Sequence, residues 1–117
     1  MEIKDSKFYR DKCYINGEWV NADSGETISV NNPANLKEIG TVPKCGTSET
    51  RNAIEAANNA WPEWRAKSAR QRSEILRKWF DLMIENKEEL AQIMTVEQGK
   101  PINCLLYTSD AADERQS

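Results

Sequence analysis

Residues Ser68 to Asn86 read S-A-R-Q-R-S-E-I-L-R-K-W-F-D-L-M-I-E-N, and this stretch decides the fold. Ser68 followed three residues later by Gln71 is a capping-box signature, so a helix is predicted to begin here. Its apolar residues repeat at helical spacing and cover about 200° of the helix: Ile75, Leu76, Trp79, Phe80, Leu82, Met83 and Ile84. One neighbouring helix covers less than that arc. We therefore expect this helix to pack against several structural elements, more of them than a chain of 117 residues obviously supplies.

The composition is that of a single globular domain, with 38% hydrophobic and 30% charged residues. The net charge of -3 comes without any run of Lys or Arg interleaved with aromatic residues, which argues against a nucleic-acid-binding protein. No stretch approaches the roughly 18 apolar residues of a membrane span, and the first residues lack the apolar core of a signal peptide. We therefore expect a cytoplasmic protein that binds neither nucleic acid nor membrane.

Three cysteines and the absence of histidine limit the chemistry. Cys13, Cys45 and Cys104 are too few and too scattered in sequence for a disulfide framework or a metal site. Without histidine, the usual Cys-His and Ser-His nucleophile pairs are excluded, together with the commonest metal ligand. Residue spacing and composition alone therefore predict a structural segment that contains no recognisable catalytic residues.

Two β-hairpins are predicted in the first part of the chain. Asn16-Gly17 lies between short apolar runs, and a type I′ turn needs positive φ at both central residues. Four strands are expected near residues 12–15, 18–20, 27–30 and 38–42. Isolated two-stranded ribbons are marginally stable in water, so both hairpins need a surface to lie upon.

A first helix is predicted to precede the central one. Thr47 or Ser48 is expected to cap it, and it should stop at Trp61 because Pro62 disfavours helical geometry at the preceding residue. Trp61 and Trp64 would then lie on either side of a tight corner. We interpret them as a structural plug rather than as a ligand-stacking site.

A third helix is predicted to begin at Asn86, with a capping box to Glu89, and to end at Gly99. Glu97 shares the spacing of the apolar face and is therefore expected to point inward; that face comprises Leu90, Ile93 and Met94. Two interpretations of Glu97 are open, a placed functional carboxylate or a structural acid held by Lys100 or backbone amides. The structural interpretation is preferred.

The sequence changes character at Cys104. Residues 104–109, C-L-L-Y-T-S, correspond to the codons TGT CTC TTA TAC ACA TCT, the mosaic end of a transposase-based sequencing adapter, and residues 110–114 fit its continuation. Such a scar is excluded from fold reasoning. We therefore expect residues 1–103 to be the first part of a longer protein and residues 104–117 to be adapter read-through, so that Cys104 has no catalytic role.

Five short stretches between Tyr14 and Ile102 resemble, in order and spacing, the amino-terminal segment of the aldehyde dehydrogenase superfamily. They are Y-I-N-G-E-W-V at residues 14–20, N-P-A-N at 32–35, I-G-T-V-P at 39–43, A-I-E-A-A at 53–57 and E-Q-G-K-P at 97–101. Four stretches are similar to bacterial NADP-linked succinate-semialdehyde dehydrogenases. They are residues 32–35, 42–51, 77–83 and 94–101. Related semialdehyde dehydrogenases share many of these residues.

The resemblance implies an α/β parent protein with a doubly wound cofactor domain, a catalytic domain and an oligomerising β-arm. Residues 1–103 would supply two short β-hairpins followed by three α-helices to this aldehyde dehydrogenase fold. The parent is expected to be a cytoplasmic homo-oligomer, dimer or tetramer. It would use NADP or NAD to oxidise a small aldehyde, in this case succinate semialdehyde to succinate in 4-aminobutyrate degradation.

In the family, a cysteine thiolate attacks the aldehyde, the thiohemiacetal passes hydride to the nicotinamide, and a glutamate activates the water that hydrolyses the thioester. Neither Cys13 nor Cys45 matches the family nucleophile, and Glu97 does not match its general base. Some members bind a monovalent cation through backbone carbonyls near the positions of Val30 and Asn31, but side-chain identity does not identify a carbonyl ligand. We assign no catalytic, cofactor-binding or metal-binding residue to this chain and expect it alone to be inactive and only marginally stable.

Two other functions stay open from the sequence. The chain could be a self-sufficient helical interaction module whose exposed apolar face docks on a partner protein. It could also be a regulatory protein made from a degenerate dehydrogenase, which requires the residues from Cys104 onward to be genuine.

Overall fold

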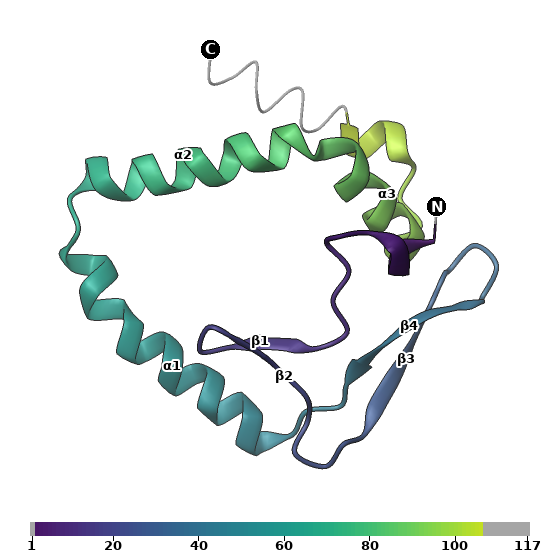
Figure 1. The fold of residues 1–117 in the computed structure, drawn as a ribbon, viewed down its shortest axis with the longest axis horizontal. Coiled ribbons are helices and arrows are strands. Elements are labelled where there is room, and N and C mark those ends of the chain that lie inside the picture. The colour runs from purple at the N-terminus through teal and green to yellow at the C-terminus, as the bar shows by residue number, and fades with distance from the viewer. Residues whose placement is uncertain (1, 107–117) are drawn as a thin grey trace.

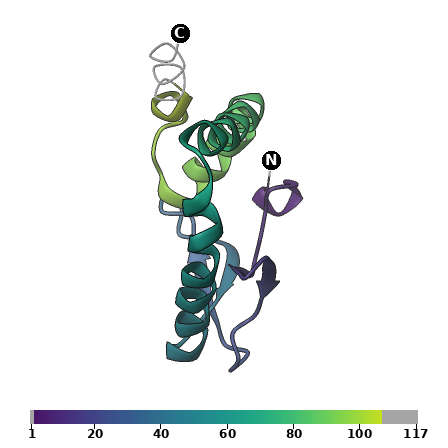
Figure 2. The same ribbon diagram turned by 90° about the vertical axis from the view of Figure 1, so that its left-hand side faces the viewer.

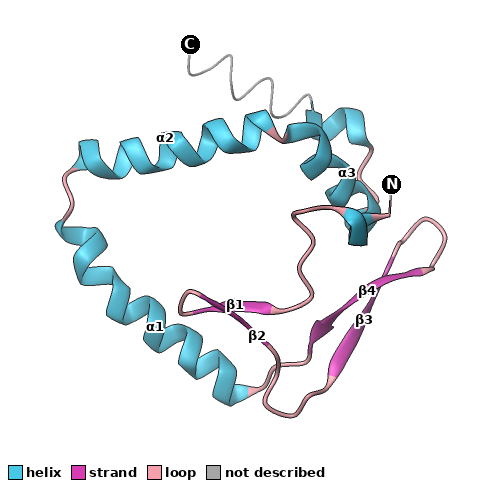
Figure 3. Ribbon diagram, in the orientation of Figure 1, coloured by secondary structure: helices cyan, strands magenta, loops and turns pink. Residues whose placement is uncertain are grey.

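A computed structural model describes residues 2–106 and shows two separate antiparallel hairpins followed by three helices (Figure 1). The elements are η1 (Ile3–Asp5), β1 (Cys13–Ile15), β2 (Glu18–Val20), β3 (Thr27–Asn31), β4 (Glu38–Pro43), α1 (Thr47–Ala66), α2 (Ala69–Glu85) and α3 (Lys87–Gln98). This order confirms the predicted architecture. The two hairpins pair only within themselves, β1 with β2 and β3 with β4 (Figure 3).

The elements form an open ring that is thin when seen edge-on (Figures 1 and 2), with extents of 45 × 39 × 19 Å. The radius of gyration is 17.2 Å, whereas a compact chain of this length has about 13 Å. The accessible surface is 9110 Å², against about 6,500 Å² for a compact protein of the same mass. The buried apolar residues among those described are Ile3, Ala22, Pro43 and Ala91, all but one of them small or at a strand end, so the ring does not enclose a hydrophobic core of its own.

The first hairpin has the geometry that its turn residues predict. Asn16 and Gly17 have φ values of 53° and 79°, both positive as a type I′ turn requires. The turn sets the register, in which Tyr14 pairs with Trp19, and their ring centroids lie 5.1 Å apart. The strands begin and end within one residue of the predicted positions.

The second hairpin is longer and has an irregularity in its register between Val30 and Asn31. Strands β3 and β4 each continue one residue beyond the predicted end, to Asn31 and Pro43. Gly40 faces the ring of Tyr9, and a Cβ atom at this position would lie 2.5 Å from the Tyr9 hydroxyl oxygen. A side chain at position 40 would therefore force the Tyr9 ring to move away from β4.

Helix α1 does not stop at Trp61 as predicted, but runs through Pro62 to Ala66. In the last turns of a helix, proline removes one backbone hydrogen bond while the residues after it can still donate theirs. Continuation also places Trp64 beside the first turns of α2, where it shares a hollow with Phe80. The corner lies instead at Lys67, so Trp61 and Trp64 are both helical residues and do not bracket it.

The start of α1 also differs from the prediction, because the N-cap is Gly46 rather than Thr47 or Ser48. Glycine has no side chain with which to cap the helix. The Glu49 carboxylate reaches back instead and accepts a short hydrogen bond from the Gly46 amide. The Glu49 carboxylate thus caps the first turn of α1, and the positive end of the helix dipole stabilises its negative charge.

Helix α2 begins with the predicted capping box. The Gln71 amide donates to Ser68 Oγ at 3.1 Å, and the Ser68 amide donates to Gln71 Oε1 at 2.9 Å. At the other end, the predicted capping box between Asn86 and Glu89 is absent from the described structure. Asn86 Nδ2 donates to the Leu82 carbonyl at 2.8 Å and so closes α2, while Glu89 accepts a 2.6 Å hydrogen bond from Ser6 Oγ.

Helix α3 ends as predicted, with Gly99 in the left-handed conformation at φ 83°. The Gly99 amide donates to the Thr95 carbonyl at 2.8 Å. A Cβ atom on Gly99 would lie 2.9 Å from Cγ of Pro33, so this glycine also allows α3 to approach the turn between β3 and β4. Within residues 2–106, none of the helices is both long enough and apolar enough to cross a lipid bilayer.

Candidate functional site

Most of the apolar face of α2 is exposed, although Phe80 and Ile84 are half-buried. We name as the α2 face its five large apolar residues that are more than a third exposed: Ile75, Leu76, Trp79, Leu82 and Met83. No residue of α2 is fully buried, although the helix is 17 residues long and strongly amphipathic in sequence. An exposed, contiguous apolar face of this kind marks a surface that binds another part of a protein.

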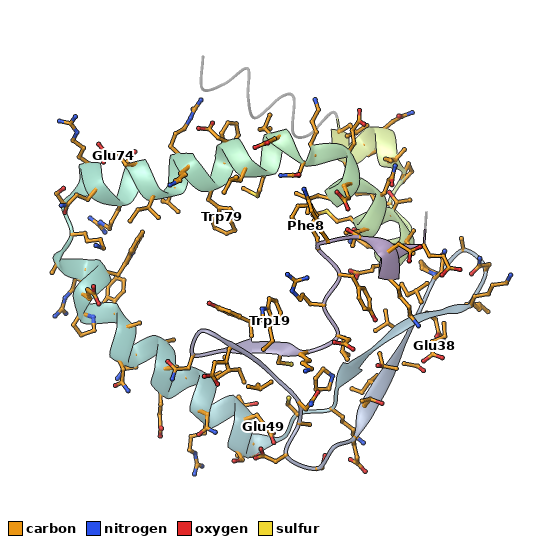
Figure 4. The ribbon with its side chains drawn as sticks, in the orientation of Figure 1. Phe8, Trp19, Glu38, Glu49, Glu74 and Trp79 are labelled. Carbon is orange, nitrogen blue, oxygen red and sulfur yellow. The ribbon has the colours of Figure 1, made fainter. Side chains whose placement is uncertain are left out.

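Aromatic residues from opposite sides of the ring face the same space. Trp79 of α2 is 61% exposed and Trp19 of β2 is 47% exposed. Figure 4 shows both side chains pointing into the ring from opposite elements, while Glu74 points outward from α2. Apolar side chains from two distant elements are therefore directed toward the inside of the ring.

On the opposite side of α2, charged side chains form ion pairs with one another and are exposed to solvent. Arg70 and Glu74 form an ion pair at 3.2 Å, and Arg77 and Asp81 form another at 3.3 Å, both between residues one helical turn apart. All four side chains are more than half exposed, so each pair contributes only about 0.3–0.5 kcal/mol. The charged side thus needs no further partner, in contrast to the α2 face.

An open hollow lies where α1 meets α2, with Trp64, Leu76 and Phe80 on its apolar walls and Arg72 beside them. Arg72 Nε is buried and has no hydrogen-bond partner among the described residues. The hollow can therefore receive an apolar group together with a hydrogen-bond acceptor. It holds no thiol, carboxylate or imidazole that could act as nucleophile or general base.

Glu49 joins the loop after the first hairpin to the start of α1 (Figure 4). It is 7% exposed, and its carboxylate accepts hydrogen bonds from two backbone amides, Gly46 and Asp23, the latter at 2.9 Å. These amides, Gly46 first and then Asp23, lower the pKa of Glu49, because they stabilise the ionised carboxylate. No local sequence pattern indicates the Asp23 contact, because 26 residues separate Asp23 from Glu49.

This arrangement does not fit a dinucleotide phosphate. The amides at a helix N-terminus can bind phosphate when they are unoccupied and no negative charge lies near. At α1 the Gly46 amide is occupied by the Glu49 carboxylate, whose negative charge would repel a phosphate. Among residues 2–106 there is also no cluster of three or more cysteine, aspartate, glutamate or histidine residues that could hold a metal ion.

The three cysteines are too few and too scattered in sequence to predict a disulfide framework, yet the fold brings the Sγ atoms of Cys13 and Cys45 to 3.8 Å. Both residues are half-buried, whereas Cys104 is exposed. Burial raises the pKa of the Cys45 thiol, and the hydrogen bond and charge of Cys13 raise it further. No local sequence signal could have found this pair, because 32 residues separate its members.

The remaining residues singled out in the sequence do not converge on a site. Glu97 was predicted to point inward but is exposed, as is Met94 at 49%, because no described element covers that side of α3. Leu90 and Ile93 are half-buried. The predictions on residues 107–117 lie outside the described residues.

Residues 19–112 match the aldehyde dehydrogenase family, and this match continues beyond Asn103. Glutarate-semialdehyde dehydrogenase from Pseudomonas putida is 60% identical over 102 residues, which are 87% of this chain and 21% of that protein. NADP(+)-linked succinate-semialdehyde dehydrogenase from Escherichia coli is 54% identical over 102 residues, which are again 87% of this chain and 21% of that protein.

Solved structures give the same result. Succinate-semialdehyde dehydrogenase from Burkholderia pseudomallei has a TM-score of 0.85 and 50% identity, covering 92% of this chain and 22% of that one. Betaine aldehyde dehydrogenase from Staphylococcus aureus, in complex with NAD+, has a TM-score of 0.85 and 29% identity, covering 93% and 22%. This chain thus spans about a fifth of the length of the proteins that it matches.

Proposed function

Because the chain belongs to the aldehyde dehydrogenase family, we propose that it is the amino-terminal part of an NAD(P)-dependent dehydrogenase that oxidises a small semialdehyde. Succinate semialdehyde, converted to succinate in 4-aminobutyrate degradation, is the first candidate substrate. The similarity to succinate-semialdehyde dehydrogenases over 87% of the chain supports it. The 60% identity to a glutarate-semialdehyde dehydrogenase makes the aldehyde with one more methylene the second candidate.

The role of this segment in the parent is structural. The observation that carries this proposal is the exposed α2 face, on which Trp79 is 61% exposed. In the parent, the helices would pack on the outside of the cofactor domain, and the two hairpins would run along the body toward the subunit contacts. The exposed apolar surface would then become interior.

The catalytic chemistry would be supplied by sequence beyond this segment. We propose that residues 1–103 hold no catalytic, cofactor-binding or metal-binding residue. The occupied Gly46 amide and the acidic Glu49 support this for the dinucleotide, since they disfavour a phosphate at α1. The parent would bind NADP or NAD elsewhere, act as a cytoplasmic dimer or tetramer, and lack residues 104–117, which we propose to be adapter read-through.

The first test is to sequence the source DNA beyond the codon for Asn103. The proposal expects an open frame that encodes a Gly-rich cofactor turn and a cysteine nucleophile. The continuous protein, purified, should reduce NADP or NAD with succinate or glutarate semialdehyde, whereas the 117-residue chain should not. A stop directly after Ser117 in the genome, or aldehyde oxidation by the short chain itself, would refute the proposal.

The substrate is decided by comparing kcat/KM for the two semialdehydes. One methylene in a substrate pocket is worth about 1–3 kcal/mol, or roughly 10- to 200-fold in kcat/KM. A preference of that size for succinate semialdehyde would support the first candidate. The reverse preference would assign the protein to glutarate semialdehyde and leave the dehydrogenase assignment intact.

The exposed α2 face also suits a self-sufficient module that docks on a partner protein, so this second function needs its own test. A module must fold alone, and a monomeric sample of the chain should then unfold in a cooperative thermal transition. A part of a larger enzyme should instead aggregate or lack such a transition. Thermal unfolding followed by circular dichroism on a size-fractionated sample distinguishes the two.

A further inference from the structure

We propose that Cys13 and Cys45 are a redox-active dithiol, which a low-molecular-weight disulfide such as glutathione disulfide oxidises to an intramolecular disulfide. The new bond would link β1 of the first hairpin to the residue before the N-cap of α1. This inference does not depend on the proposed dehydrogenase activity, because both residues and their contacts lie within the described part of the chain.

The distance between the thiols suits this chemistry. The Sγ atoms are 3.8 Å apart, close enough for a thiol hydrogen bond, and a disulfide bond requires about 2.05 Å. Rotation of the two side chains about their Cα–Cβ bonds moves each sulfur by more than the remaining gap. Both residues are half-buried and not fully enclosed, so a small disulfide can approach them.

The backbone around the pair is held in place by contacts that do not involve sulfur. Cys13 pairs with Val20 across the first hairpin, whose register the Asn16-Gly17 turn sets. Beyond β2, the Asp23 amide donates to Glu49 Oε1 at 2.9 Å, and the other oxygen of that carboxylate accepts from the Gly46 amide. Glu49 therefore fixes the hairpin relative to the residue that follows Cys45.

The oxidation proceeds by thiol–disulfide exchange. One cysteine thiolate attacks a sulfur of glutathione disulfide, which forms a mixed disulfide and releases one glutathione thiolate. The second cysteine thiolate attacks the protein sulfur of the mixed disulfide, forms the Cys13–Cys45 bond and releases the second glutathione thiolate. The pair loses two electrons, glutathione disulfide gains them, and the two thiol protons pass to the released glutathione.

The surroundings of Cys45 slow attack by this thiol at neutral pH. Its pKa is raised first by burial, then by the hydrogen bond and charge of Cys13, and further by the nearby acids Glu49 and Asp23. Since the thiolate is the attacking species, attack by Cys45 should become faster as the pH rises toward its raised pKa.

The test is an equilibrium titration, in glutathione redox buffers, of the continuous protein that the source DNA encodes, with the redox state of Cys13 and Cys45 followed by peptide mapping. Each sample is measured in native buffer and in guanidinium chloride. Mapping of the oxidised sample should show a Cys13–Cys45 link that is two hydrogen atoms lighter than the two reduced peptides together. The native midpoint should lie at a ratio of squared glutathione to glutathione disulfide that is roughly tenfold or more higher than in denaturant.

The variant Cys45→Ser supplies the matched control, since Cys13 can then form only a mixed disulfide with glutathione. Equal midpoints in native buffer and denaturant would overturn the proposal, because the disulfide would then form no more readily in the folded chain than in the unfolded chain. Accumulation of a doubly glutathionylated chain with no Cys13–Cys45 link would overturn it as well.

Discussion

Replacing Trp79 with alanine tests whether the α2 face is covered in the parent enzyme. The Trp79 side chain is 61% exposed in this chain. A tryptophan offers about 250 Å² of surface, so about 150 Å² is left for a partner to cover. At about 25 cal/mol per Å², covering that area stabilises the parent by about 4 kcal/mol. The same substitution in the 117-residue chain should change stability by less than about 1 kcal/mol, because the area is already in water.

The measurement is the thermal midpoint of the parent enzyme, with and without Trp79→Ala. Since 102 residues are 21% of the Pseudomonas putida relative, the parent should have roughly 490 residues. At about 2 cal/mol/K of unfolding entropy per residue, a loss of about 4 kcal/mol lowers Tm by about 4 °C. Loss of activity after heating should shift to lower temperature by a similar amount.

Lys78→Ala is the matched control, because Lys78 is the exposed neighbour on the charged side of the same helix. Alanine and lysine have similar helix propensities, so this change should move Tm by less than about 1 °C. If Trp79→Ala lowers Tm of the parent no more than Lys78→Ala does, the α2 face stays exposed there. The structural role proposed for this segment would then be wrong.

Three further substitutions test contacts within the segment, each in the parent enzyme. Ser68→Ala removes the acceptor of the Gln71 amide and should destabilise by about 1 kcal/mol in urea unfolding, whereas Ser68→Asp, which keeps an acceptor, should not. Pro62→Ala restores an amide donor inside α1 and should stabilise by up to about 3 kcal/mol; a loss of stability would show that the helix does not continue there. Glu49 has a lowered pKa in the folded state, so its contribution is present above the ordinary glutamate value near 4.5 and is lost as the pH falls through the lowered pKa. Glu49→Gln should therefore reduce stability at neutral pH and flatten the acid side of the pH–stability profile, and an unchanged profile would contradict the amide contacts.

The sequence predicted those elements whose determinants lie within a few residues of one another. The positive φ values that Asn16 and Gly17 adopt fix the first hairpin, and Ser68 with Gln71 fixes the start of α2. Gly99 ends α3 for the same kind of reason, since only the local backbone has to adopt a left-handed conformation. These signals need no knowledge of the rest of the fold.

Local signals failed where two acceptable local states compete. Pro62 can end a helix or lie in its last turns, and Trp64 packing beside α2 favours the longer helix. Asn86 can cap α3 or close α2, and its side chain bonds to the Leu82 carbonyl. Glu89 is then left to accept from Ser6, 83 residues away, a partner that no local pattern indicates.

The sequence by itself determined the order of elements, the family resemblance and the apolar arc of α2, because these depend on residue type and spacing along one chain. Only the tertiary structure decided that Glu49 bonds to the Asp23 amide, that Cys13 meets Cys45, and that the α2 face has no cover among residues 2–106. Such contacts join residues 26 and 32 positions apart. Their formation depends on how the hairpins and helices are arranged in space, which is set by the sum of many weak contacts and not by any one stretch of sequence.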